Sequence, residues 1–139
     1  MNTEVDAQVW YEIATLITEF QRRLDHGERG NLGELFTPDA LMNSPHGEIR
    51  GAEAIAALFA TKPANAPAVS RHSWSNLRIQ PLADGRMKAT MLNTAWQGDD
   101  DLTLKTIAVS DITEIVARGD DGRWRFDERA FGRVFVQNF

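Results

Sequence analysis

Residues 5–24, VDAQVWYEIATLITEFQRRL, decide how the fold begins. The apolar side chains of this stretch recur at the spacing of one helical face. They are Trp10, Ile13, Leu16, Ile17, Phe20 and Leu24. The spacing predicts a long amphipathic helix that begins at a cap formed by Thr3 and Asp6 and ends near Asp25 or His26. Gly27 or Gly30 can supply the left-handed turn that ends it.

Three short elements are predicted after this helix. Residues 31–36 suit a second, short helix closed by a turn at residues 37–40, and residues 41–50 suit a small hairpin turning at Pro45-His46-Gly47. Residues 52–60 are rich in alanine and also contain isoleucine and leucine, which predicts a third helix. The proline-containing loop at residues 61–68 then stands where it could shape the mouth of a pocket.

From Val69 onward the pattern is that of β-structure. Turn signals at Asp84-Gly85, Gly98-Asp99 and residues 120–122 divide the remainder into four meandering strands. The sequence therefore predicts a single α+β domain over residues 1–139, in which N-terminal helices pack on a curved antiparallel sheet and enclose one apolar pocket.

The last strand carries apolar groups on both faces, including Phe131, Val134, Phe135 and Val136. A sheet that is apolar on both sides needs two coverings. The helices supply one, and we expect a second copy of the chain to supply the other through the outer face, with a β-bulge near Gly132.

Composition narrows the possible partners. The chain has 20 acidic and 15 basic residues without a block of like charge, which argues against a nucleic-acid or membrane partner. It has no cysteine, which excludes disulfides and thiolate chemistry and favours the cytoplasm, and no targeting segment or membrane span is evident. The three histidines lack metal-ligand spacing, so we expect no metal and no cofactor.

Asp25 and His72 are the residues that most suggest chemistry. A carboxylate in the last turn of a helix faces the negative end of the helix dipole, so a tertiary contact is a natural explanation for Asp25. A carboxylate bound to one imidazole nitrogen leaves the other free as a general base. The alternatives are a solvated aspartate at a frayed helix end and a core histidine bonded to a backbone carbonyl.

Five further residues are predicted to contact a substrate. Alternation places Trp74 and Asn76 on the same strand face as His72, and it places Asp111 on a face with Ile107 and Val109, where burial would make it an acid. An arginine partner such as Arg86 or Arg129 is the structural alternative for Asp111. Phe20 and Trp96 complete the set, although such aromatic residues more often belong to a core.

Several short motifs, taken in order, resemble the SnoaL-like family of the nuclear transport factor 2-like superfamily. They are Leu24-Asp25-His26-Gly27, residues 35–40 (LFTPDA), Arg50-Gly51 with Ala54-Ile55, Arg71-His72 with Asn76, and residues 121–126 (DGRWRF). The resemblance covers nearly the whole chain and implies a cone-shaped α+β barrel, usually dimeric, with a deep apolar cavity.

Within that family, Asp25 and His72 are similar to the aspartate and histidine of scytalone dehydratase-like members, where they form the catalytic base. The resemblance implies a cofactor-independent lyase or isomerase that abstracts a proton from a small apolar or aromatic, carbonyl-bearing molecule. The steroid-isomerase branch fits less well, because Phe20 and Ser44 stand where it needs a tyrosine and a carboxylate. The alternative is a non-catalytic binding or assembly protein related to the small subunits of ring-hydroxylating dioxygenases.

Overall fold

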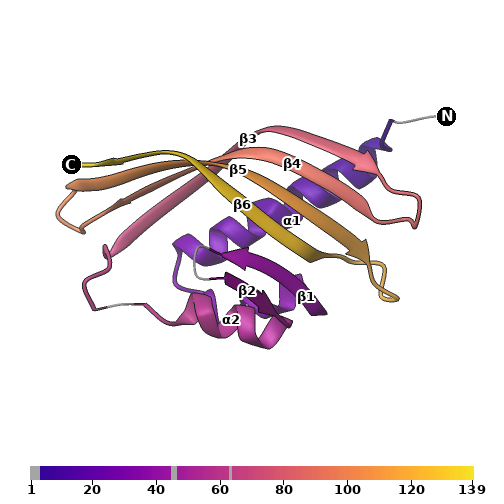
Figure 1. Cartoon of the computed structure of the whole chain (residues 1–139), viewed down its shortest axis with the longest axis horizontal. Helices are drawn as coiled ribbons and strands as arrows, with labels where there is room; N and C mark the ends of the chain where they lie inside the picture. Colours follow the sequence, from indigo (N-terminus) through magenta and orange to yellow (C-terminus); the bar gives the residue numbers. More distant parts are fainter. Residues whose placement is uncertain (1–3, 45–46, 63) are drawn as a thin grey trace.

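The computed structural model describes residues 4–44, 47–62 and 64–139. Within them, three helical segments pack on a six-stranded curved sheet that stays open (Figure 1). The helices are α1 (Ala7–Asp25), the 3₁₀ helix η1 (Arg29–Leu35) and α2 (Ala52–Ala60). The strands are β1 (Phe36–Ser44), β2 (Gly47–Arg50), β3 (Val69–Pro81), β4 (Met87–Gly98), β5 (Leu104–Arg118) and β6 (Trp124–Asn138). The predicted α+β class is confirmed.

Most predicted elements are present with small shifts in their ends. The first helix starts after Asp6, whose side chain accepts a hydrogen bond from the backbone N–H of Gln8 at 2.8 Å, and Gly27 adopts a φ of 84° beyond its end. Thr3, the other half of the predicted cap, and Pro45 and His46, which form most of the predicted hairpin turn, lie outside the described residues. The third helix has the predicted bounds.

Two local predictions need correction. Residues 37–40 do not close a turn but belong to β1, and the segment before them is a 3₁₀ helix that begins at Arg29. The sheet is also not wholly antiparallel: in the order β2-β1-β6-β5-β4-β3, β1 runs parallel to β6. Pairing of β1 with the last strand joins the N-terminal hairpin to the meander, which local sequence patterns could not reveal.

The four long strands β3–β6 form one arched layer, and α1 runs obliquely across it (Figure 1). The apolar stripe of α1 faces the sheet, with Ile13, Ile17 and Phe20 almost fully buried. Phe20 makes edge-to-face contacts with Phe36, Phe59 and Phe126 at centroid distances of 5.5–6.0 Å. Burial of one such ring contributes roughly 1.5–3 kcal/mol, so this cluster fixes the helix against the sheet.

Two bulges in β6 change which residues face α1. Phe126 pairs with Val116 and Glu128 with Ile115, so Asp127 is an extra residue; Val134 is a second one. The predicted bulge near Gly132 therefore falls two residues later. Because each bulge reverses the alternation that follows it, Arg129 faces the same side as Phe126.

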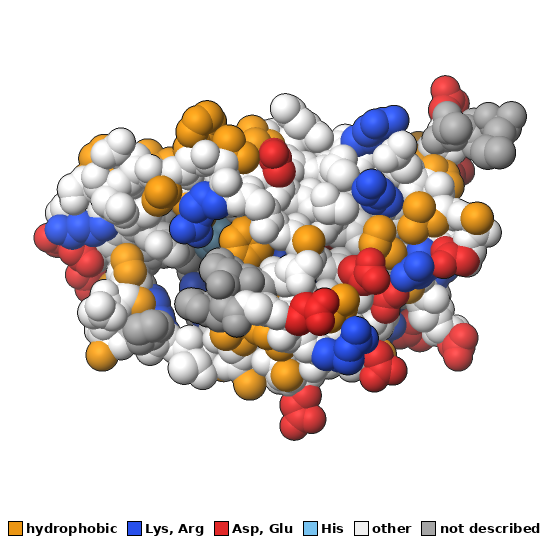
Figure 2. All heavy atoms as spheres, in the orientation of Figure 1, with side chains coloured by type: hydrophobic (Ala, Val, Ile, Leu, Met, Phe, Trp, Pro, Cys, Tyr) orange, Lys and Arg blue, Asp and Glu red, His pale blue; other side chains and the backbone are white. Residues whose placement is uncertain are grey.

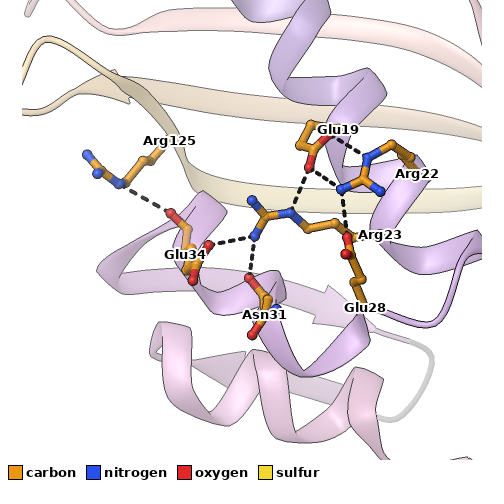
Figure 3. A network of polar contacts seen from close by, with 7 residues as sticks. All are labelled: Glu19, Arg22, Arg23, Glu28, Asn31, Glu34 and Arg125. Atoms are coloured by element: carbon orange, nitrogen blue, oxygen red, sulfur yellow. Dashed lines mark hydrogen bonds and ion pairs between the residues drawn. The ribbon is translucent and has the colours of Figure 1, made fainter.

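A network of ion pairs fastens the end of α1 to its neighbours (Figure 3). Arg23 bonds Glu19, Glu34 and the backbone carbonyl of Asn31, and Arg125 on β6 reaches the carbonyl of Glu34. Glu19 is held by two arginines, and their bonds lower its pKa to about 2. The network positions the last turn of α1, which carries Asp25.

Charges are mixed over the face that Figure 2 shows, where acidic and basic side chains are interspersed rather than gathered in one patch. Among the described residues, no helix is both long and apolar enough to cross a membrane.

Candidate functional site

Asp25 and His72 lie in direct contact. Asp25 is the last residue of α1, and His72 lies on β3, one of the two edge strands of the sheet. The Nδ1 atom of His72 is 2.6 Å from Oδ1 of Asp25, and the backbone N–H of His72 donates to Oδ2 at 2.7 Å. Ser70 adds a third bond, from its hydroxyl to Oδ1 at 2.9 Å. The helix-end carboxylate therefore accepts bonds from the edge of the sheet.

The surroundings of Asp25 keep it ionised. Its side chain is only 6% exposed, and burial by itself raises the pKa of a carboxyl group. Bonds from the His72 ring, the His72 backbone and Ser70 oppose this effect, and the net pKa of Asp25 lies below its ordinary value. An ionised acceptor on Nδ1 favours the tautomer that carries its proton there, so Nε2 is left as the basic atom.

His72 opens onto a cavity of about 290 Å³ between α1, α2 and the sheet. Apolar side chains and a few polar ones make up its wall. The lining residues are Phe20, Leu24, Met42, Leu58, Phe59, His72, Asn93, Ala95, Gln97, Thr106, Ala108, Ser110, Ile112, Arg129, Phe131 and Arg133. A mostly apolar wall with a small number of convergent polar groups is typical of a small-molecule site. Of the residues predicted to contact substrate, Phe20 lines this cavity.

A buried ion pair borders the cavity, and sequence reasoning missed it. Arg129 donates to Glu114 at 2.6 Å across neighbouring strands, and its guanidinium lies over the Phe20 ring at 4.3 Å. Burial raises the pKa of Glu114 to about 7, although the charge of Arg129 opposes this, and burial also lowers the pKa of Arg129. The signal in the sequence was Glu114 itself, a carboxylate that strand alternation places between the apolar residues Ile112 and Val116.

A buried carboxamide pair is the second feature that sequence reasoning missed. The side-chain amide of Gln21 on α1 donates to Oδ1 of Asn93 on β4 at 2.7 Å, and both residues are less than a tenth exposed. Asn93 lines the cavity. With its oxygen occupied by Gln21, Asn93 retains its N–H donors for a ligand.

Trp74 and Asn76 lie away from the cavity lining. Trp74 shares the α1-facing side of β3 with His72, but it lies further along the helix, where its indole N–H donates to Thr18 and its ring meets Trp10 edge-on. Asn76 is exposed and has a φ of 57°, in a bulge where the β3–β4 register shifts. Neither residue lines this cavity, so their predicted contacts with a substrate stay predictions.

Trp96 and Asp111 lie on the opposite face of the sheet. Trp96 pairs with Ile107 across the sheet. The residues of β4 and β5 that line the cavity lie on the other face: Asn93, Ala95 and Gln97 on β4, and the even-numbered residues from Thr106 to Ile112 on β5. Asp111 is exposed, and the arginines proposed as its partners bond elsewhere, Arg129 to Glu114 and Arg86 to Asp84 and Asp127. Neither residue lines this cavity, so their predicted contacts with a substrate also stay predictions.

The guanidinium of Arg71 donates hydrogen bonds to the backbone carbonyls of Ser70 and Asp25, so its contacts in the structure are with the backbone. Across the described residues, no group of three or more histidine, aspartate or glutamate side chains could hold a metal ion.

The open curved sheet, the helices packed on it and the enclosed cavity define a cone-shaped α+β protein of the nuclear transport factor 2-like superfamily. The chain belongs to the SnoaL-like domain family, whose model matches residues 7–130. No protein of curated function matches it in sequence.

Solved structures share this fold at low sequence identity. A candidate scytalone dehydratase from Novosphingobium aromaticivorans has a TM-score of 0.81 and 17% identity, covering 94% of this chain and 87% of that one. A type 3 hexachlorocyclohexane dehydrochlorinase from Novosphingobium barchaimii has a TM-score of 0.81 and 16% identity, covering 95% and 90%. A Catenulispora acidiphila protein in complex with S-DNPA has a TM-score of 0.78 and 22% identity, covering 92% and 95%.

Proposed function

We propose that this protein is a cofactor-independent lyase or isomerase that removes a proton from carbon in a small apolar or aromatic, carbonyl-bearing substrate. His72 is the base and Asp25 orients it. The observation that carries the proposal is the 2.6 Å contact between Nδ1 of His72 and Asp25, with the same imidazole lining the cavity. General base catalysis by a positioned histidine contributes roughly 10²- to 10⁴-fold to a rate.

The step balances without a cofactor. Nε2 of His72 takes the proton from carbon, and the C–H electron pair moves toward the carbonyl oxygen to give an enolate. In an isomerase the imidazolium returns the proton to another carbon. In a lyase the enolate re-forms the carbonyl and expels a group, with its bonding electron pair, from the neighbouring carbon, so that a carbon–carbon double bond forms. The imidazolium then gives its proton to the departing group. Asp25 stabilises the imidazolium, as an ionised carboxylate does for a charged ring.

Two cavity groups suit the negative charge that develops on the substrate. Arg129 holds a buried guanidinium at the wall, and Asn93 presents N–H donors that Gln21 fixes in orientation. Preorganised donors in a site of low dielectric stabilise such charge more strongly than water does. This arrangement supports proton abstraction in particular, rather than the mere enclosure of an apolar ligand.

The relatives support the same class of chemistry. A dehydratase and a dehydrochlorinase, by their names, both eliminate a small group, and the Catenulispora acidiphila structure holds a small molecule. Because the identities are below 25%, these relatives support the choice of reaction class and not the choice of substrate.

The test is exchange of carbon-bound hydrogen. A panel of small cyclic and aromatic ketones is incubated with the protein in D₂O, and loss of the α-proton signal is followed by NMR. We expect His72→Gln to slow exchange about 10²- to 10⁴-fold. His26→Gln is the matched control, because His26 is an exposed histidine next to Asp25. Exchange at the full rate in His72→Gln would refute the mechanism, and ligand binding without exchange in the wild type would favour the non-catalytic binding protein.

A further inference from the structure

The inner face of β6 presents two arginines separated by an aromatic ring. Arg129, Phe131 and Arg133 all line the cavity, in alternate positions along one strand. Alternate residues of a strand lie about 6.6 Å apart, so the row provides a cation, a ring and a second cation along one wall. Arg129 is the deeper of the two, at 10% exposure, and Arg133 is exposed at the mouth.

The cavity is electrostatically unlike the rest of the protein. The chain carries a net charge of −5, yet the cavity-lining residues that the structure describes include Arg129, Arg133 and His72 and no aspartate or glutamate. Glu114 balances Arg129, and Asp25 lies against His72. The side chain of Arg133 forms no hydrogen bond or ion pair with any residue that the structure describes. Its charge is therefore uncompensated within the described cavity.

The residues around Arg133 in the cavity wall do not neutralise its charge. Ser110 is its cross-strand partner on β5, and further lining residues on β4 and β5, Gln97 and Thr106, are neutral. A solvated surface arginine is the alternative interpretation. It does not explain why the guanidinium lies at the mouth of a cavity without an acid, when 20 acidic residues are distributed elsewhere along the chain.

We propose that the cavity binds organic acids: a small cyclic molecule whose carboxylate pairs with Arg133 while its ring lies against Phe131. Arg133 is then a specificity-determining residue. The planar guanidinium fork matches a carboxylate, and hydrogen bonds between ionised groups are about twice as strong as neutral ones. This inference rests on the proposed function, because it names the class of substrate that the His72 site would accept.

The experiment uses two probes of the same shape and different charge, 2-naphthoate and 2-naphthamide. Their dissociation constants are measured by isothermal titration calorimetry at pH 7.5 for the wild type, Arg133→Gln and Arg78→Gln. Arg78 is the matched control, an exposed strand arginine that does not line the cavity. We expect the wild type and Arg78→Gln to bind the acid about tenfold more tightly than the amide, and Arg133→Gln to lose that ratio.

Other outcomes would overturn the inference. They are a ratio near one in the wild type, no detectable binding of either probe, or a ratio that Arg133→Gln preserves. The outcome is separable from the deuterium-exchange test. Exchange of neutral ketones without preference for the acid would leave the proposed function standing and remove the organic-acid specificity. Preference for the acid without exchange of any substrate would leave the organic-acid specificity standing and remove the proposed catalytic function.

Discussion

One carboxylate, that of Asp25, binds both the ring and the backbone of His72: Oδ1 lies 2.6 Å from Nδ1, and Oδ2 accepts the backbone N–H at 2.7 Å. The contact therefore fixes the imidazole and also satisfies a donor on an edge strand of the sheet. Asp25 therefore contributes both to stability and to the proposed chemistry. Substitutions at Asp25 should change the free energy of unfolding and the rate of proton exchange.

Asp25→Asn should lower both activity and stability. Asparagine cannot stabilise an imidazolium by charge, so we expect proton exchange to fall about 10²- to 10⁴-fold. Because the pKa of Asp25 is lowered in the folded state, its stabilisation is present above the ordinary value of 3.8 and is lost as pH falls through the folded value. Urea unfolding should give a difference in stability between the two proteins that is present above about pH 4 and shrinks as pH falls further. A constant difference down to pH 2 would contradict the assignment.

Ser70→Ala is a milder change at the same site than Asp25→Asn. It removes one hydrogen bond to Asp25 and leaves those from His72 in place. We expect a loss of about 1 kcal/mol in stability and less than a tenfold loss in exchange. An effect on exchange as large as that of Asp25→Asn would show that Ser70 has a further role.

The buried Glu114–Arg129 pair should give the protein an unusual dependence on pH near neutrality. Burial raises the pKa of Glu114 from 4.5 to about 7, so between these values the folded chain binds more protons than the unfolded chain. The unfolding free energy should therefore fall as pH rises from about 4.5 to about 7, by at most about 1.4 kcal/mol per pH unit from this group, and level off above. In Glu114→Gln this component should vanish in urea unfolding curves. An identical pH profile for the two proteins would contradict it.

The Gln21–Asn93 pair should act as a coupled unit. Gln21→Met leaves the buried oxygen of Asn93 without its donor, which costs about 1–3 kcal/mol. The double variant Gln21→Met with Asn93→Leu removes both polar groups, so it should be more stable than the sum of the single effects implies. A double-mutant cycle measured by urea unfolding tests this. Strictly additive effects would mean that the hydrogen bond contributes nothing.

The predicted homodimer through the outer sheet face stays a prediction, and the structure offers a specific test. Trp96, Ile107, Val109 and Phe135 lie on that face in cross-strand pairs, and Phe135 is 69% exposed. An exposed apolar patch of this kind suits a subunit interface. Light scattering at micromolar concentration should give the mass of two chains for the wild type and of one for Phe135→Asp. Leu102→Asp, at a turn that is almost fully exposed, should remain dimeric. A monomeric wild type would refute the prediction.

Local patterns were enough to predict the helix of α1 and the three turns of the meander. They also singled out Asp25 and His72, which lie in contact in the structure. Helical periodicity, turn chemistry and an unfavourable helix-end charge are properties of neighbouring residues, and each can be assessed without knowing the rest of the chain. The same patterns failed on β5, where Ile107, Val109 and Ile115 make one face apolar and Ile112 and Val116 do the same for the other. Hydrophobicity does not tell which face of β5 meets the helix, so the face of Asp111 could not be assigned from the sequence.

The sequence by itself determined the α+β class, the first and third helices and the four strands of the meander. Tertiary structure alone decided which side chains share the cavity. The extra residue Asp127 shifts the register of β6, so Arg129 and Arg133 face inward where unbroken alternation from Phe126 would place Glu128 and Ala130. A bulge is specified by pairing with a neighbouring strand of the sheet and not by its own residues alone, and a shift of one position moves every following side chain to the other face.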